Sequence, residues 1–116
     1  FGATGGLRAA GFFDTGGSLI LLLEDSGRHN AVDKVVGRRL LDGRLPDSDA
    51  ILTVSGRAGY EVVQKAVAAG IPCLVAVGAP SSLAILTARR FDLTLVGFLK
   101  SDRFNVYSGG ERLSSD

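Results

Sequence analysis

The 116-residue sequence has one cysteine and one histidine, and no methionine or tryptophan. A single cysteine cannot form an intrachain disulfide, and one cysteine with one histidine falls short of the four ligands of a structural zinc site. No apolar run approaches the roughly 20 residues of a membrane-spanning helix. The first residues also lack the basic region and apolar stretch of a secretory signal peptide. We therefore expect no disulfide, no bound metal of its own and no membrane partner.

An excess of charge of either sign is also missing. The 13 basic and 12 acidic side chains give a net charge of +1, which creates no strong field for nucleic acid or an acidic membrane. Hydrophobic residues make up 46% of the chain and charged residues 22%, a balance that supports a buried core. Because the sequence opens without methionine and has room for one core, we interpret residues 1–116 as a single domain of a longer protein.

Short apolar runs alternate with helical patterns along the chain, which is typical of a parallel sheet with helices on its faces. The runs are apolar at consecutive positions, as expected for strands covered on both sides. The four strand candidates are Leu19–Leu23, Ile51–Val54, Cys73–Val77 and Leu93–Phe98. The pattern predicts a three-layer α/β/α sandwich with a mostly parallel sheet. Cys73 lies within one of these runs and is interpreted as a small buried hydrophobic residue.

Amphipathic helices are predicted between the strands. The first covers Asn30–Leu41, and its inward side is predicted to carry Val32, Val35, Val36 and Leu40. The second covers Tyr60–Ala69 and is closed by Gly70 and Pro72.

Two further helices are predicted nearer the ends of the chain. One begins after Pro80 with Ser81 or Ser82 as its N-cap. The other covers Thr4–Phe12 and leads through a turn into the first strand.

Ligands of open α/β sheets bind where the carboxyl ends of strands run into helix N-termini. Four segments have this position, namely Glu24–Asn30, Ser55–Gly59, Gly78–Ser82 and Gly97–Arg103. If the strands are parallel, the segments share one edge and bring together the basic side chains Arg28, His29, Arg57, Lys100 and Arg103. Small residues let the backbone approach a ligand closely at Ser26, Gly27, Ser55 and Gly56. The sequence therefore predicts an anion or nucleotide site at this edge.

Each of these features also has a purely structural explanation. Gly27 and Gly56 suit tight turns, and arginines at helix starts often face solvent. The similar loops Ser26–Arg28 and Ser55–Arg57 fit either two lobes of one anion site or two plain turns. His29 is compatible with a general base or with a bond to a backbone carbonyl. No dinucleotide fingerprint, P-loop or nucleophile elbow is present in the sequence, so an NAD site, an ATP site or a serine nucleophile is not supported.

The stretch Glu24–Gly37, EDSGRHNAVDKVVG, resembles the signature of the formate dehydrogenase accessory protein family (FdhD). The similarity continues in four further blocks, Thr4–Ala10, Ser55–Ala66, Ile71–Ala84 and Leu93–Leu113. Separate blocks in the same order are more specific than any single motif, so the chain is identified as a member of this family.

The resemblance implies a cytoplasmic sulfurtransferase. Family members pass persulfide sulfur from a cysteine desulfurase to the molybdenum bis(molybdopterin guanine dinucleotide) cofactor that formate dehydrogenase requires. The resemblance also implies a cytidine-deaminase-like fold, and a homodimer is compatible with it. The matching cofactor-binding stretch is Phe98, Leu99, Lys100, Ser101, Asp102 and Arg103.

Several positions depart from the family pattern. The family's persulfide cysteines belong to a CxxC-type loop that would precede Phe1, and Cys73 matches neither of them. We therefore expect the isolated chain to supply cofactor binding, without a catalytic residue and without sulfur transfer. Arg8 and Ser26 replace a histidine and a valine that are usual in the family.

Two other functions remain as alternatives. The first is a non-catalytic module that binds guanine nucleotide or the cofactor. The second, less favoured, is a sugar-phosphate-binding domain, because residues 55–77 resemble the strand, serine-rich loop and helix of sugar isomerase domains.

Overall fold

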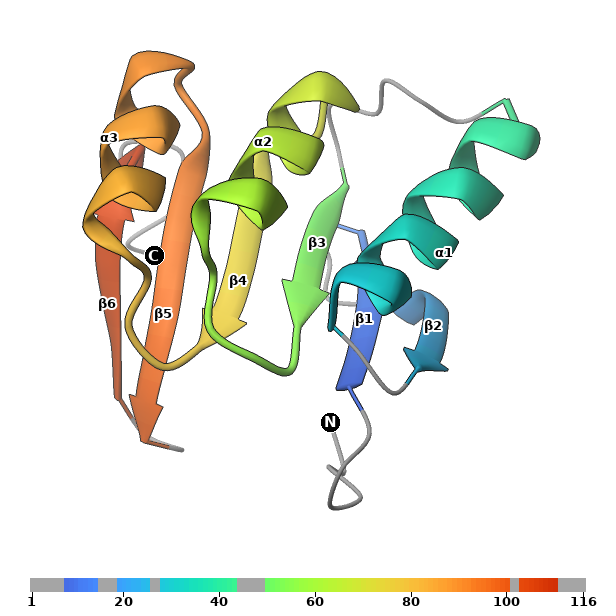
Figure 1. The fold of residues 1–116 in the computed structure, drawn as a ribbon, viewed down its shortest axis with the longest axis horizontal. Helices are drawn as coiled ribbons and strands as arrows, with labels where there is room; N and C mark the ends of the chain where they lie inside the picture. Colours follow the sequence, from blue (N-terminus) through green and yellow to red (C-terminus); the bar gives the residue numbers. More distant parts are fainter. Residues whose placement is uncertain (1–7, 15–18, 26–27, 44–49, 101–102, 111–116) are drawn as a thin grey trace.

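The computed structural model describes residues 8–14, 19–25, 28–43, 50–100 and 103–110. Strands and helices alternate through this part of the chain (Figure 1). In order, they are β1 (Arg8–Phe13), β2 (Leu19–Asp25), α1 (Arg28–Leu41), β3 (Ile51–Val54), α2 (Tyr60–Ala68), β4 (Cys73–Val77), α3 (Ser82–Arg90), β5 (Thr94–Lys100) and β6 (Arg103–Ser108). All four strands expected from the apolar runs are present.

The strands form one sheet in the order β2-β1-β3-β4-β5-β6. β4 runs parallel to β3 and to β5, whereas β1 is antiparallel to both β2 and β3, and β6 is antiparallel to β5. Because β1 runs against both of its neighbours, β2 points in the same direction as β3, β4 and β5. The prediction of a mostly parallel sheet is wrong: the sheet is mixed, because β1 and β6 are antiparallel strands that the apolar pattern did not identify.

The N-terminal helix prediction is also wrong in the described part of its range. Arg8–Phe13 forms the strand β1, which is paired on both sides, while residues 4–7 lie outside the described residues. Ala10, Gly11 and Phe12 are all buried, and each is paired with β2 on one side and with β3 on the other. Pairing with two strands therefore outweighs the helical tendency of the alanines.

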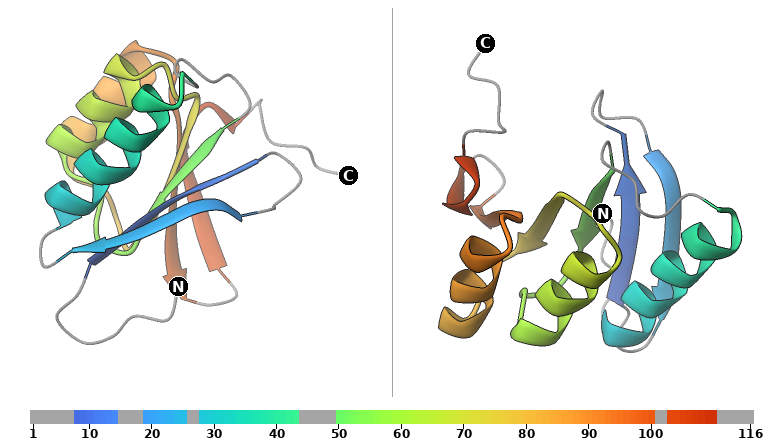
Figure 2. Two further views of the ribbon diagram at one scale, coloured as in Figure 1. Left: turned by 90° about the vertical axis from the view of Figure 1, so that its right-hand side faces the viewer. Right: turned by 90° about the horizontal axis from the view of Figure 1, so that it is seen from above.

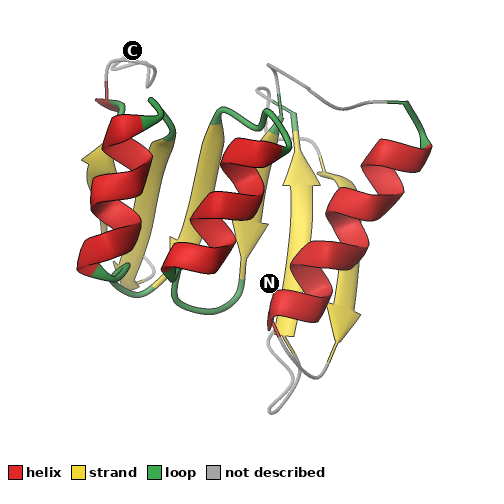
Figure 3. Ribbon diagram, turned by 45° about the horizontal axis from the view of Figure 1, so that its top comes forward, coloured by secondary structure: helices red, strands yellow, loops and turns green. Residues whose placement is uncertain are grey.

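All three helices lie on the same face of the sheet (Figures 2 and 3). The described residues thus form two layers, and the third layer of the predicted sandwich is not among them. This arrangement also lacks the crevice of a doubly wound fold, which arises where successive helices pass to opposite faces.

Two rows of side chains, paired across the strands, face the helices. The first row is fully buried and consists of Phe12, Leu52, Leu74 and Leu95. The second row lies two residues nearer the carboxyl ends of β3, β4 and β5. It consists of the smaller residues Ala10, Val54, Ala76 and Gly97. Burial of one large apolar side chain contributes roughly 1.5–3 kcal/mol. The core is therefore thickest in the middle of the sheet and thinner toward the edge where the strands end.

Helix α1 turns Val32, Val35 and Val36 toward the core as predicted, but not Leu40. Val32 and Val35 are fully buried, and Arg39 continues their line, 8% exposed, with its guanidinium 5.5 Å from the centre of the Phe12 ring. The spacing of three and then four residues keeps these three side chains on one side of the helix. Leu40 lies off that line and is 64% exposed, so its predicted inward position is wrong.

The ends of α2 and α3 follow the sequence signals. After α2, Gly70 has φ +72°, its N–H donates to the Val67 carbonyl at 3.1 Å, and the Ile71 N–H donates to the Ala66 carbonyl at 3.0 Å. These two bonds form a Schellman motif, which satisfies carbonyls at the helix end. At the start of α3, Ser81 is the N-cap, since its Oγ accepts a hydrogen bond from the Ala84 N–H at 3.1 Å.

Candidate ligand-binding edge

The carboxyl ends of β2, β3, β4 and β5 lie along one edge of the sheet, as Figure 1 shows. This confirms that the four segments of the sequence prediction follow strands that share one direction. β1 separates β2 from β3, so the ends of β2 and β3 lie about two strand spacings apart, on the order of 10 Å. The end of β5 lies two more spacings along the edge. A ligand that touched all four loops would therefore be on the order of 20 Å long.

The predicted site residues are distributed over this edge. Three of them form the segment directly after β3: Ser55 is half-buried, Gly56 is buried and Arg57 is exposed. By their backbone positions, Arg28 and His29 begin α1, Phe98, Leu99 and Lys100 end β5, and Arg103 begins β6. Gly27, Ser101 and Asp102 lie outside the described residues. That the loops of Arg28 and Arg57 form two lobes of one anion site therefore stays a prediction.

Two loops at the centre of the edge are joined by hydrogen bonds. The loop after β3 covers residues 55–59, and the loop after β4 covers residues 78–81. Two backbone bonds reach the first loop: the N–H of Val77, the last residue of β4, donates to the Gly56 carbonyl at 3.2 Å, and the Ser81 N–H of the second loop donates to the Ala58 carbonyl at 3.1 Å. The Arg57 side chain adds a third bond, from Nε to the Ala79 carbonyl at 3.2 Å. The two loops are thus held together at the position where the sequence places an anion site.

Glycines allow the second loop to lie close to β5. Gly78 has φ +81°, a backbone conformation that favours glycine. A Cβ added at Gly97 would lie 2.5 Å from the carbonyl oxygen of Gly78, so no larger residue fits there without movement. The sequence analysis did not single out the role of Gly97. A glycine inside an apolar strand, as in LTLVGF, is the signal that indicates close approach of another backbone.

Cys73 lies far from this edge. It is half-buried and is the first residue of β4, whereas the candidate loop follows the last residue, Val77. Four residue steps in a strand correspond to about 13 Å. Leu74 faces the helices, so Cys73 faces the opposite side of the sheet.

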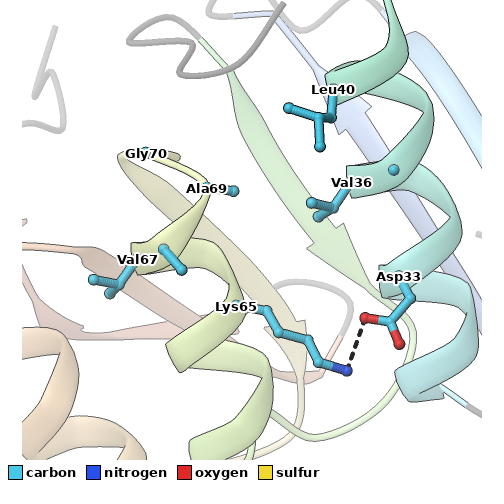
Figure 4. A pocket seen from close by; sticks show the side chains of 9 residues that line it. Asp33, Val36, Leu40, Lys65, Val67, Ala69 and Gly70 are labelled. Atoms are coloured by element: carbon cyan, nitrogen blue, oxygen red, sulfur yellow. Dashed lines mark ion pairs between the residues drawn. The ribbon is translucent and has the colours of Figure 1, made fainter.

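A groove of about 760 Å³ lies between α1 and α2, away from the strand ends (Figure 4). Its apolar lining includes Val36, Leu40 and Val67, and the ion pair between Lys65 Nζ and Asp33 Oδ1, at 2.9 Å, lies among its lining residues. The sequence patterns did not predict this groove. Leu40 and Leu41, the two adjacent leucines in the last turn of α1, are both exposed, and this apolar pair is the feature that could have indicated it.

Neither a metal centre nor a membrane span is found in the described part of the chain. Its residues contain no group of three or more His, Cys, Asp or Glu side chains placed to hold a metal ion. Its helices are too short or too polar to cross a membrane.

The described residues define an α/β domain of six strands and three helices, with small-residue loops at the ends of its parallel strands. The sequence profile of the FdhD/NarQ family matches residues 1–114. The chain is 58% identical to a protein named sulfur carrier protein FdhD from Nocardia farcinica over 115 residues, which cover 99% of this chain and 41% of that protein. It is 51% identical to the protein of the same name from Sulfurisphaera tokodaii, over 97% of this chain and 44% of that protein.

Structural similarity agrees with the sequence match. A crystal structure described as that of a provisionally assigned formate dehydrogenase accessory protein from Desulfotalea psychrophila superposes with a TM-score of 0.85 at 37% identity, covering 96% of this chain and 49% of that one. The chain belongs to the FdhD/NarQ family. It spans less than half the length of these relatives. The family profile matches residues 1–114, whereas the resemblance to sugar isomerase domains was limited to residues 55–77. The family assignment is therefore preferred to the sugar-phosphate-binding alternative.

Proposed function

We propose that this chain is the cofactor-binding part of a sulfur carrier protein that acts in the maturation of formate dehydrogenase. The supporting observation is the identity of 50–58% to proteins named sulfur carrier protein FdhD over 97–99% of the chain. The complete protein is a cytoplasmic sulfurtransferase, which takes persulfide sulfur from a cysteine desulfurase and delivers it to the molybdenum bis(molybdopterin guanine dinucleotide) cofactor. That cofactor is the substrate, and formate dehydrogenase is its destination.

The strand-end edge binds the nucleotide portion of this substrate. Arg57, Lys100 and Arg103 pair with phosphate oxygens, where guanidinium and ammonium groups make charge-assisted hydrogen bonds. Backbone N–H groups of Ser55 and Gly56 approach the same phosphates. A guanine ring lies against Phe98. An edge on the order of 20 Å long matches a substrate with two dinucleotide arms better than it matches a mononucleotide.

The sheet face without helices is covered in the complete protein, which gives the three-layer, cytidine-deaminase-like sandwich. The supporting observation is a set of exposed apolar side chains on that face, because Val77 is 47%, Phe104 55% and Val106 41% exposed. Contiguous apolar surface of this kind is usually an interface. The relatives have more than half of their length outside the region matched here, which is enough chain to form the missing layer.

Complementation of a bacterial strain that lacks its own family gene tests the proposed function. The full-length protein carrying this sequence should restore formate dehydrogenase activity, and the double variant Lys100→Ala and Arg103→Ala should restore about a tenth or less. The matched control is Arg90→Ala, which removes a cation from the far end of α3. Restoration by the Nocardia farcinica relative but not by this protein would contradict the proposal.

A further inference from the structure

Arg57 is exposed and yet held in place. Its Nε–H donates to the Ala79 carbonyl at 3.2 Å, and its Cγ lies 3.3 Å from the position that a Cβ would occupy on Gly78. The guanidinium is therefore held at its first nitrogen, and the stem of the side chain lies close to the backbone of Gly78. Exposed arginines normally keep most of their rotamer freedom in the folded state. Arg57 has lost part of that freedom before any ligand arrives.

The remaining donors of Arg57 are available for a ligand. A guanidinium carries five N–H donors, of which the bond to Ala79 uses one. The four N–H groups on the two η nitrogens make no hydrogen bond or ion pair with another residue of the described ranges. Those four groups form the planar, forked arrangement that matches two phosphate oxygens at once.

We infer that Arg57 selects a phosphorylated ligand at the strand-end edge, and that the carbonyl of Ala79 is the group that positions its guanidinium. This inference rests on the proposed function of the edge. A guanidinium that is already oriented loses less conformational entropy when it binds phosphate, which strengthens binding without a new contact. The same bond joins the loop after β3 to the loop after β4, so a phosphate on Arg57 also stabilises the second loop.

Lysine cannot replace arginine in this arrangement. An Arg57→Lys variant keeps the positive charge and three N–H donors, but all three are on one tetrahedral nitrogen, which lacks the planar fork that bonds the Ala79 carbonyl through one nitrogen and two phosphate oxygens through the others. Arg57→Ala removes the charge and the bond to Ala79 together. Comparison of the two variants therefore separates positioning from charge.

Arg89 provides a matched control. It is exposed and makes the same kind of bond, from Nε to the Tyr107 carbonyl at 3.0 Å. It lies in the last turn of α3, whereas the strand-end edge lies at the first turn of that helix (Figure 1). Arg89→Lys therefore loses an equivalent hydrogen bond at the other end of the molecule.

Calorimetric titration of the full-length protein carrying this sequence with GDP and with guanosine tests the inference. The wild type should bind GDP more tightly than guanosine. Arg57→Ala should weaken GDP binding about tenfold or more without changing guanosine binding, and Arg57→Lys should weaken it about fivefold. Arg89→Lys should leave both affinities unchanged. Without ligand, amide hydrogen exchange of Ala79 and Ser81, the amides on either side of Pro80, should be faster in Arg57→Lys than in the wild type.

The possible failures are distinguishable. GDP binding that is as tight in Arg57→Lys as in the wild type, or unchanged exchange of Ala79 and Ser81 in that variant, would overturn the positioning by Ala79. An equal loss of GDP and guanosine binding in Arg57→Ala would overturn the selection of phosphate. A wild type that binds no GDP would contradict the proposed function, and the inference would fall with it.

Discussion

Gly97 of β5 lies directly against the carbonyl oxygen of Gly78, since a Cβ added at Gly97 would come within 2.5 Å of that oxygen. The same Cβ would lie 3.1 Å from Cε2 of Tyr107. The loop after β4 therefore reaches its position only because β5 has no side chain at this point. That loop carries the Ala79 carbonyl to which Arg57 donates, so Gly97 supports the candidate edge without belonging to it.

The first prediction concerns this contact. Gly97→Ala should lower the free energy of unfolding by about 1–3 kcal/mol, because a backbone oxygen has little room to move away from the added methyl group. The control is Gly37→Ala in α1, where an added Cβ has no atom within 4 Å. That variant should raise the free energy of unfolding by about 0.5–1 kcal/mol, because alanine restricts the unfolded chain. Urea denaturation measures both values, and equal stability of the two variants would contradict the contact.

The second prediction separates the two candidate caps of α3. Ser81→Ala should cost about 1 kcal/mol, because its Oγ accepts the hydrogen bond from the Ala84 N–H. Ser82 is the first residue of the helix and is exposed, so Ser82→Ala should change the free energy of unfolding by less than about 0.5 kcal/mol. Thermal denaturation of the two variants is a sufficient test. A larger cost for Ser82→Ala would move the cap to that residue.

The third prediction is that Cys73 carries no sulfur. It lies at the amino end of β4, opposite to the candidate edge, and it is half-buried. After incubation with a cysteine desulfurase and cysteine, mass spectrometry of the full-length protein should find no persulfide on Cys73. Cys73→Ala should leave complementation unchanged and cost about 1 kcal/mol of stability from lost packing. Persulfide on Cys73, or loss of complementation, would show that this thiol takes part in transfer.

The sequence predicted the four strands that share one direction, but not the two that oppose them. The first four are runs of large apolar residues, which pattern reasoning detects well. β1 has alanine and glycine in place of large apolar residues at its centre, and it becomes a strand through pairing with β2, the next strand along the chain, and with β3, which is far from it in the sequence. β6 has Phe104 and Val106 in alternation with polar residues, a weaker signal that is typical of an exposed edge strand.

The sequence predicted which loops form the candidate edge, but it did not predict the contacts between them. The alternation of strands and helices indicates which segments share an edge, whatever their side chains do. The bond between Arg57 and Ala79 joins residues 22 positions apart, and it depends on the register of β3 with β4 and on the close approach at Gly97. The groove between α1 and α2 depends on how the two helices diverge over the sheet. No spacing in the sequence encodes either feature.

Amide hydrogen exchange of the full-length protein carrying this sequence, with and without GDP, tests the central claim, that the strand-end edge is the nucleotide site. GDP should slow exchange in residues 55–59 and 78–82, the two loops joined by the Arg57 bond. It should leave exchange unchanged in residues 36–41 and 67–70, which border the groove between α1 and α2. Slower exchange around that groove with none at the two loops would contradict the assignment of the edge, and the same exchange everywhere at saturating GDP would contradict nucleotide binding itself.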